Sequence, residues 1–188
     1  MPVRIIPRSA FAEGRWRNGL GVSWDIASDG GAAGDFGWRL AIARIDGDVP
    51  FSDYPAVDRV FTLIDGDGLS LDVAGLGRLE VAERFAPVRF PGDAATLCRL
   101  KGGACLALNL FVARRAWRAD VAAGPLEAAV DLGAAPVSLV FALRRLLRLG
   151  TASLDEGDAA IVTGAATLSP TRPGCIAYVA RLEPSADR

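Results

Sequence analysis

The stretch Ala104–Ala113 reads Ala-Cys-Leu-Ala-Leu-Asn-Leu-Phe-Val-Ala, which is the pattern of a β-strand with two unlike faces. Successive side chains of a strand point to opposite sides of the sheet. One face is therefore bulky and apolar, and the other carries Cys105, Ala107, Asn109, Phe111 and Ala113. An amide among small, buried side chains needs a polar partner to offset its burial. We therefore predict that Asn109 faces an interior with space for a polar group.

A second stretch, Gly37–Ile45, repeats this pattern. Its bulky face holds Trp38, Leu40, Ile42 and Arg44, and its smaller face holds Gly37, Arg39, Ala41, Ala43 and Ile45. If the small faces of the two strands line one interior, Arg39 and Asn109 can hold a ligand there. The alternative places Arg39 on an exposed face and leaves Asn109 with a purely structural hydrogen bond.

Turn-forming residues recur at short intervals along the chain, and short apolar runs, often alternating, lie between them. This spacing is typical of an all-β sandwich or barrel, and no segment has helix caps at both ends. We therefore expect an all-β, cupin-like fold with little helix. The Asp65–Gly68 turn predicts a hairpin between residues 58–64 and 70–73. Residues 94–100 and 104–112 predict another hairpin.

The stretch Val137–Leu149 fits a helical stripe about as well as a strand pattern. Its Val and Phe content, and the glycine after it, favour two strands that meet near Arg144 and Arg145. The sequence Gly-Asp-Ala precedes an apolar strand twice, at 92–94 and 157–159. This echo favours two similar halves within a single unit spanning 1–188, one half at 1–121 and the other at 137–188, joined near 122–136.

Composition excludes several classes of function. The chain has 188 residues, of which 51% are hydrophobic, so it can bury a substantial core. Its 21 basic and 22 acidic residues leave a formal charge of −1, which argues against a nucleic-acid partner. It contains no histidine, which excludes His-ligated metal sites, a Ser-His-Asp triad and His acid–base chemistry. We therefore expect no metal and no cofactor.

The cysteines and the apolar runs indicate a cytoplasmic protein. Cys98, Cys105 and Cys175 are odd in number and form no CxxC pair, so we interpret them as reduced core residues. The apolar stretches Val137–Leu143 and Ala104–Leu108 fall well below the roughly 20 residues of a membrane helix. The N-terminal apolar run is too short for a signal peptide. We therefore expect no membrane partner.

Two further segments carry candidate ligand-binding residues. In the loop Pro50–Arg59, Arg59 enters a strand on the face shared by Phe61 and Leu63. A guanidinium among apolar groups suits the capture of a carboxylate. The alternative is an ion pair of Arg59 with Asp58 or Asp53 that only fixes the loop. Upstream, the segment 16–19 offers Trp16 as an aromatic wall and Asn18 as an amide.

The order and spacing of these motifs resemble the HutD/Ves family of cupin-like proteins. The residues that carry the resemblance are Trp16–Gly21, Ser23, Asp25, Trp38–Ala43, Phe51–Pro55, Asp58, Arg59, Asp65–Gly68, Phe90–Asp93 and Leu108–Leu110. The resemblance implies two cupin-like halves and an association with histidine utilisation, whose intermediates include small carboxylates such as urocanate and formiminoglutamate. It carries over five ligand-binding positions: Trp16, Asn18, Arg39, Arg59 and Asn109. The chain departs from the family pattern at Ala107 (usually Asp), Ala56 (often Gly) and Asp25 (usually Glu).

These observations predict a metal-free cupin-like protein that binds a small anionic metabolite and has a regulatory or accessory role in histidine or amino-acid catabolism. This interpretation favours a binding protein over an enzyme and leaves catalysis open. Two alternatives stay open. One is a metal-independent enzyme that uses Asp25, Asp58 or Tyr54 for acid–base chemistry. The other is a β-barrel interaction module, with a homodimer as a candidate assembly.

Overall fold

The computed structural model describes residues 3–30, 36–133 and 135–186. Within these ranges the fold is almost entirely β, and the one helical element is the 3-10 turn η1 (Arg8–Ala10). The chain divides into two compact units. Residues 12–117 form the first unit, and the residues up to 11 together with 118–186 form the second. The prediction of an all-β fold with little helix is confirmed.

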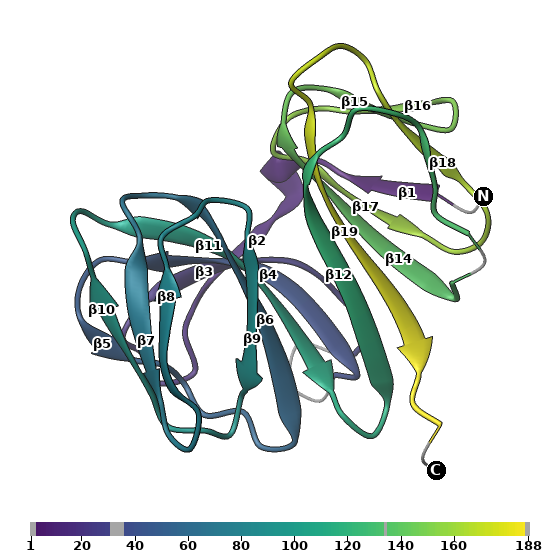
Figure 1. Cartoon of the computed structure of the whole chain (residues 1–188). Coiled ribbons are helices and arrows are strands. Elements are labelled where there is room, and N and C mark those ends of the chain that lie inside the picture. Colours follow the sequence, from purple (N-terminus) through teal and green to yellow (C-terminus); the bar gives the residue numbers. More distant parts are fainter. Residues whose placement is uncertain (1–2, 31–35, 134, 187–188) are drawn as a thin grey trace. The chain divides into compact units, whose positions relative to one another are not determined.

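The first unit is a sandwich of two sheets rather than a closed barrel (Figure 1). Its six-stranded sheet has the order β2 (Ala12–Arg15), β3 (Val22–Ser28), β4 (Trp38–Ile45), β11 (Cys105–Ala113), β6 (Val57–Asp65), β9 (Pro87–Pro91). Its four-stranded sheet has the order β5 (Val49–Pro50), β10 (Thr96–Leu100), β7 (Leu69–Val73), β8 (Gly77–Val81). One core fills the space between the sheets, with Phe61 and Leu63 from one side and Leu71 and Cys98 from the other.

The second unit is built in the same way and has its own core. Its five-stranded sheet has the order β1 (Val3–Ile6), β17 (Ala159–Val162), β14 (Val137–Arg144), β19 (Ile176–Pro184), β12 (Trp117–Pro125). Its four-stranded sheet has the order β13 (Val130–Asp131), β18 (Thr167–Pro170), β15 (Leu147–Leu149), β16 (Ala152–Leu154).

Strand pairing shows that the two units repeat one topology. In the first, β6 lies between β11 and β9, as β14 lies between β19 and β17 in the second. Likewise β7 lies between β10 and β8, as β15 lies between β18 and β16. The run β4–β11 therefore corresponds, strand by strand, to the run β12–β19. Two similar halves are confirmed.

The boundary between the halves differs from the one predicted from sequence. Residues 117–125 form β12, the first strand of the second repeat, so much of the expected join at 122–136 is sheet. At the other end, β1 pairs with β17, with Val3 opposite Val162, so the N-terminal strand belongs to the second unit. The Gly-Asp-Ala echo is not at equivalent places either. Residues 92–94 lie between β9 and β10, whereas 157–159 lead into β17, the counterpart of β9.

The two predicted hairpins do not form. Although β6 and β7 are consecutive, β6 pairs with β11 and β9, whereas β7 pairs with β10 and β8. Strands β10 and β11 are likewise in different sheets. An alternating pattern specifies which face of a strand is buried, and both sheets of a sandwich bury one face in the same core. The pattern therefore does not decide whether a turn returns the chain to the same sheet or carries it across.

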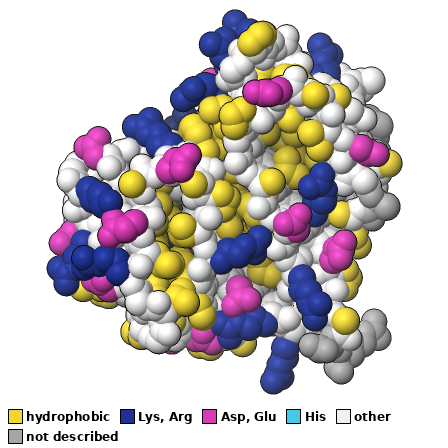
Figure 2. Space-filling model, in the orientation of Figure 1, with side chains coloured by type: hydrophobic (Ala, Val, Ile, Leu, Met, Phe, Trp, Pro, Cys, Tyr) yellow, Lys and Arg dark blue, Asp and Glu magenta, His cyan; other side chains and the backbone are white. Residues whose placement is uncertain are grey.

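The stretch 137–149 forms two strands, β14 and β15, as predicted. The chain turns between them at Arg145, whose φ of 64° is in the left-handed region. Within the described residues, no helix is long and apolar enough to cross a membrane. Figure 2 shows basic and acidic side chains interspersed on the face that it draws, in keeping with the near-zero net charge.

Candidate functional site

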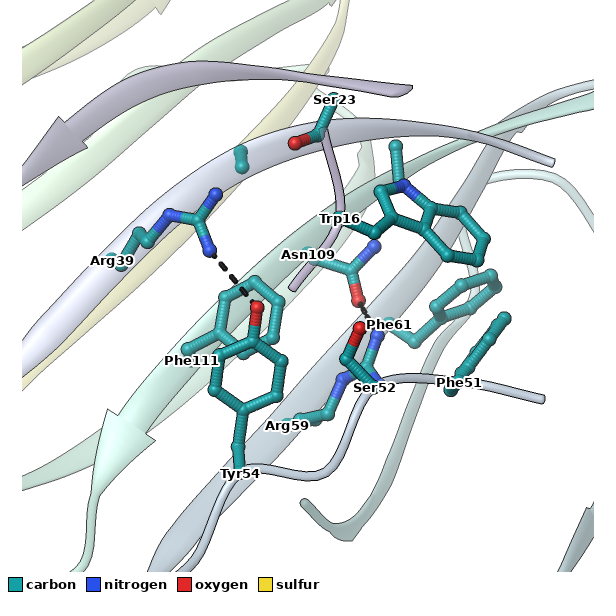
Figure 3. A pocket seen from close by; sticks show the side chains of 12 residues that line it. Trp16, Ser23, Arg39, Phe51, Ser52, Tyr54, Arg59, Phe61, Asn109 and Phe111 are labelled. Atoms are coloured by element: carbon teal, nitrogen blue, oxygen red, sulfur yellow. Dashed lines mark hydrogen bonds between the residues drawn. The ribbon is translucent and has the colours of Figure 1, made fainter. Parts of the chain in front are cut away.

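A recess opens inside the first unit, and four of the five residues predicted for ligand binding line it (Figure 3). The recess has an empty volume of about 410 Å³ when its open mouth is included, and the centre of a water-sized sphere can reach about 30 Å³ of it. The freely accessible space is thus that of about one or two water molecules. The lining residues are Trp16, Ser23, Arg39, Ala41, Ala43, Phe51, Ser52, Tyr54, Arg59, Phe61, Asn109 and Phe111.

Strand register places the polar groups of the recess side by side. On β11, Asn109 lies opposite Ala41 of β4 and Phe61 of β6. Residues in register on neighbouring strands point to the same face of the sheet. The small faces predicted for Gly37–Ile45 and Ala104–Ala113 therefore do line one interior. Ala41 supplies only a methyl group there, which leaves the space that the recess occupies.

Arg59 is the central cation of the recess and is only 6% exposed. Its Nη2 donates a hydrogen bond of 2.8 Å to Asn109 Oδ1. Its guanidinium carbon lies 4.7 Å from the ring centroid of Phe51, 5.0 Å from that of Phe90 and 5.0 Å from that of Phe111. Arg59 is thus enclosed by three aromatic rings, an arrangement that favours a cation.

Arg59 has no ion pair with any carboxylate of the described residues. The expected alternative of a pair with Asp58 does not occur, because Asp58 accepts a 2.6 Å bond from Arg114 instead. Two donors of the recess also lack an acceptor in this part of the chain: Arg59 Nε and Asn109 Nδ2. A buried cation and a buried amide therefore present unsatisfied N–H groups together.

Burial lowers the pKa of Arg59 to about 10, and the nearby charge of Arg39 contributes in the same direction, while Tyr54 opposes it. A guanidinium with this pKa is still protonated at neutral pH. Moving a charge from water into a protein interior without a counter-ion costs several kcal/mol. The positive charge of Arg59 is therefore not balanced by a negative charge from the described residues.

Arg39, the second cation, is already neutralised. Its Nε donates to Asp25 Oδ1 at 2.8 Å, its Nη2 donates to the same oxygen, and its Nη1 donates to the Tyr54 hydroxyl at 3.3 Å. Burial lowers the pKa of Arg39, but the hydrogen bonds and charge of Asp25 outweigh this, so the pKa lies above its ordinary value. Among the described residues, the positive charge of Arg59 is thus left without a counter-ion.

Trp16 forms an aromatic wall, as predicted. Its Nε1 donates to the Val22 carbonyl at 3.0 Å, and its ring packs edge-on against Phe51 with centroids 5.7 Å apart. Gly21 makes this placement possible, because a Cβ there would overlap the Trp16 ring.

Asn18 does not line the recess, unlike the other four predicted residues. Its Nδ2 donates to the Pro50 carbonyl at 3.0 Å, its backbone N–H donates to Ser52 Oγ at 3.1 Å, and its Oδ1 accepts from the Leu20 N–H at 3.1 Å. The first two contacts hold the 16–21 turn against Pro50 and Ser52, and the third lies within the turn. Asn18 therefore joins two segments beside the recess and does not line it.

The five predicted ligand-binding residues do not include the loop side chains that close the recess, namely Phe51, Ser52 and Tyr54, of which only Tyr54 is considered from sequence, and for acid–base chemistry. The aromatic residues next to prolines in the segment 50–55 were an available signal, but only Arg59 was assigned to the pocket from it. The Tyr54 ring packs 4.7 Å from the Phe111 ring, so it contributes a wall as well as a hydroxyl.

Comparison with known families identifies the family of this chain. The HutD family model matches residues 8–177, which is most of the chain. The chain belongs to the HutD family. Among curated relatives, an uncharacterized 21.2 kDa protein from the hutC 3′ region of Pseudomonas putida is 37% identical over 105 residues, covering 55% of each chain. Protein Ves of Citrobacter koseri is 35% identical over 108 residues, covering 56% of each chain. The chain thus spans about half the length of these relatives.

Two solved structures resemble this HutD-family chain along nearly its full length. A conserved protein of unknown function from Pseudomonas aeruginosa has a TM-score of 0.87 at 28% identity, covering 97% of this chain and 100% of that one. HutD from Pseudomonas fluorescens has a TM-score of 0.84 at 25% identity, covering 98% of this chain and 100% of that one.

The second half of this HutD-family chain does not repeat the site. The β-bulge that interrupts the β11–β6 pairing recurs in the equivalent β19–β14 pairing and aligns the two halves. At the place where Asn109 pairs with Phe61 in the first half, Val179 pairs with Val140 in the second. Both valines belong to the buried apolar core. The same register places Ser138 at the position equivalent to Arg59. The cation and the amide of the first half are thus replaced by a serine and a valine, respectively, in the second half.

The departures of the chain from the family pattern have physical consequences. Ala107 lies on the same face of β11 as Asn109 and is fully buried, so alanine in place of an acid leaves no carboxylate beside the recess. Ala56 has a φ of 57°, a left-handed conformation that glycine adopts without strain.

Among the described residues, no group of three or more Cys, Asp and Glu side chains is placed to hold a metal ion. The three cysteines are free and buried.

Proposed function

We propose that the recess binds the carboxylate group of a small metabolite, and that the protein has a regulatory or accessory role in amino-acid catabolism in the cytoplasm. The observation that carries this proposal is the Arg59 guanidinium, which is buried and has no carboxylate partner among the described residues. A bound anion supplies the missing counter-charge. It also accepts hydrogen bonds from Arg59 Nε and Asn109 Nδ2, and such charge-assisted bonds are the stronger ones.

The dimensions of the recess support a small ligand. The freely accessible space of about 30 Å³ suits a small group such as a carboxylate, and the recess opens to solvent, where the rest of the molecule can lie. Trp16, Tyr54 and Phe111 line the recess with aromatic surface. An apolar lining with few, well-placed polar groups is typical of small-molecule sites. The chemistry thus favours a compact organic acid.

The family supports a link to amino-acid catabolism. One relative is named for the hutC 3′ region, and the solved HutD from Pseudomonas fluorescens is described for a formate condition. Formate is the smallest carboxylate, so it is a suitable first probe.

The geometry supports binding better than acid–base catalysis. Of the two carboxylates considered for catalysis, Asp25 is bonded to Arg39 and Asp58 to Arg114. Asp58 does not line the recess at all. Neither carboxylate is held ready to take a proton from a molecule in the recess.

Isothermal titration calorimetry and thermal shift with formate, acetate, urocanate and formiminoglutamate test the proposal. A ligand at 100 times its Kd stabilises the folded protein by about 2.7 kcal/mol. We expect at least one of these acids to bind with a sub-millimolar Kd, and acetamide, the neutral isostere of acetate, to bind far more weakly.

Arg59→Met is expected to abolish this binding. Arg78→Met is the matched control, because Arg78 is exposed and forms an ion pair with Asp72 in the four-stranded sheet of the first unit, outside the recess. If none of the acids binds, or if acetamide binds as well as acetate, the proposal is wrong.

A further inference from the structure

One loop supplies three walls of the recess. Residues 50–56 carry Phe51, Ser52 and Tyr54. Phe51 stacks closest to the Arg59 guanidinium, at 4.7 Å, and Tyr54 packs against Phe111. The position of this loop therefore decides how well Arg59 is shielded from water, and shielding strengthens any ion pair that Arg59 makes.

A single guanidinium fastens the end of this loop. Arg114 Nη1 and Nη2 each donate to a different oxygen of Asp93 at 2.8 Å, and its Nε donates to Asp58 at 2.6 Å. Its Nη2 also donates to the Val57 carbonyl at 3.1 Å, and its backbone N–H donates to the Ala56 carbonyl at 3.0 Å. Asp93 in turn accepts from the Ala56 N–H at 3.3 Å. The loop end, the start of β6 and the β9–β10 turn are thus joined at Arg114.

The chain next to Asp93 reaches further into the loop. The Tyr54 N–H donates to the Gly92 carbonyl at 2.9 Å, and the Gly92 N–H donates to the Val57 carbonyl at 2.7 Å. A Cβ at residue 92 would lie 2.9 Å from that carbonyl oxygen, so only glycine allows this close approach. The backbone of Tyr54 is therefore held by the same turn that Arg114 binds through Asp93.

The wall and the loop are connected through one strand. Asn109 and Phe111 lie on β11, and Arg114 follows the last residue of that strand. The hydrogen bonds from Arg114 hold the pKa of Asp93 well below its usual range, so the carboxylate stays ionised at physiological pH.

We propose that Arg114 is a positioning residue for anion binding, because it holds the 50–56 loop against β11 and so keeps the aromatic walls over Arg59. This inference rests on the proposed function, since it concerns the affinity of the same recess. The guanidinium is suited to the task, because its planar fork bonds Asp93 through two nitrogens while a third reaches Asp58.

The first test measures the Kd of acetate in Arg114→Met and Asp93→Asn, with circular dichroism to confirm that each variant is folded at the assay temperature. Residues that orient metal ligands typically contribute about 10- to 100-fold to affinity, and by analogy we expect a Kd about tenfold higher in each variant. Arg114→Lys should recover only part of the loss, because an ammonium group cannot reproduce the forked contact. Arg78→Met should leave the Kd unchanged. A Kd within twofold of wild type in both folded variants overturns the proposal.

A second measurement needs no ligand. Hydrogen exchange at the Tyr54 and Ala56 amides reports how firmly the loop is held. We expect exchange to be about tenfold faster in Arg114→Met and unchanged in Arg78→Met. Unchanged hydrogen exchange in Arg114→Met would show that Arg114 does not hold the 50–56 loop, and it overturns the proposal whatever the binding data show. Faster exchange with an unchanged Kd overturns its link to affinity. A wild-type protein that binds none of the four acids while exchange still responds refutes the proposed function and not the fastening of the loop.

Discussion

The buried charge of Arg59 leads to a prediction about stability without ligand. Folding lowers the pKa of Arg59 to about 10, so the folded protein holds this proton less tightly than the unfolded chain does. The protonated side chain therefore costs folding free energy at every pH below about 10, and the cost fades as pH rises above that value. Relative to the ordinary pKa of an arginine side chain, this lowering corresponds to a cost of about 3 kcal/mol at pH 7.

The double variant Arg59→Met/Asn109→Leu removes this cost while keeping similar side-chain volume. It also removes the hydrogen bond between the two residues, so that neither partner is left unsatisfied. Even a buried ion pair can often be replaced by apolar residues of similar volume with no loss of stability or with a gain of about 1 to 4 kcal/mol. We expect the double variant to be more stable than the ligand-free wild type by about 1 to 3 kcal/mol.

Urea unfolding at pH 7 in a buffer free of carboxylates, followed by tryptophan fluorescence, measures this difference. The single variant Arg59→Met serves as a comparison, because it leaves Asn109 Oδ1 buried without a donor, at a cost of about 1 to 3 kcal/mol. Added acetate should stabilise the wild type and have no effect on the double variant. If the double variant is less stable than wild type by more than about 1 kcal/mol, Arg59 stabilises the empty fold, and the argument from an uncompensated charge is refuted.

Three further predictions follow from the recess and its supports. Because Arg59 has a pKa of about 10, it stays protonated at lower pH. The affinity for acetate should therefore be constant within about twofold between pH 6 and pH 9 and should fall as pH rises through 10. Calorimetry across this range measures the profile, and a loss of affinity centred near pH 7 would contradict the prediction. Ala56→Gly should raise the free energy of unfolding by about 1 kcal/mol, because it relieves a left-handed alanine, and chemical denaturation would reveal any destabilisation that disproves this. Gly21→Ala should displace the Trp16 ring, seen as a shift of tryptophan emission, and should weaken acetate binding; unchanged emission would show that the ring tolerates the added methyl group.

Much of the recess could be predicted from single strands. The period of two placed Arg39 on the small face of one strand and Asn109 on that of another, and both side chains line the recess. Arg59 could be placed on the face of Phe61 for the same reason. These predictions hold because the side-chain direction along a strand depends on local geometry alone.

Other features depended on contacts between distant segments. Asn18 resembled a ligand-binding amide, but its partners Pro50 and Ser52 lie more than 30 residues away. Whether Arg59 had an acidic partner was open from sequence, since Asp58 and Asp53 were both near. Only the placement of Arg114 showed that Asp58 is engaged elsewhere.

The sequence by itself determined the all-β class, the faces of the strands, the two strands within 137–149 and membership of the HutD family. The tertiary structure alone decided which strands pair, where the repeat begins and that Arg59 is a buried cation without a counter-ion. The physical reason is that alternation is set within a few residues, whereas pairing and charge compensation depend on groups that meet only when the sheets are assembled.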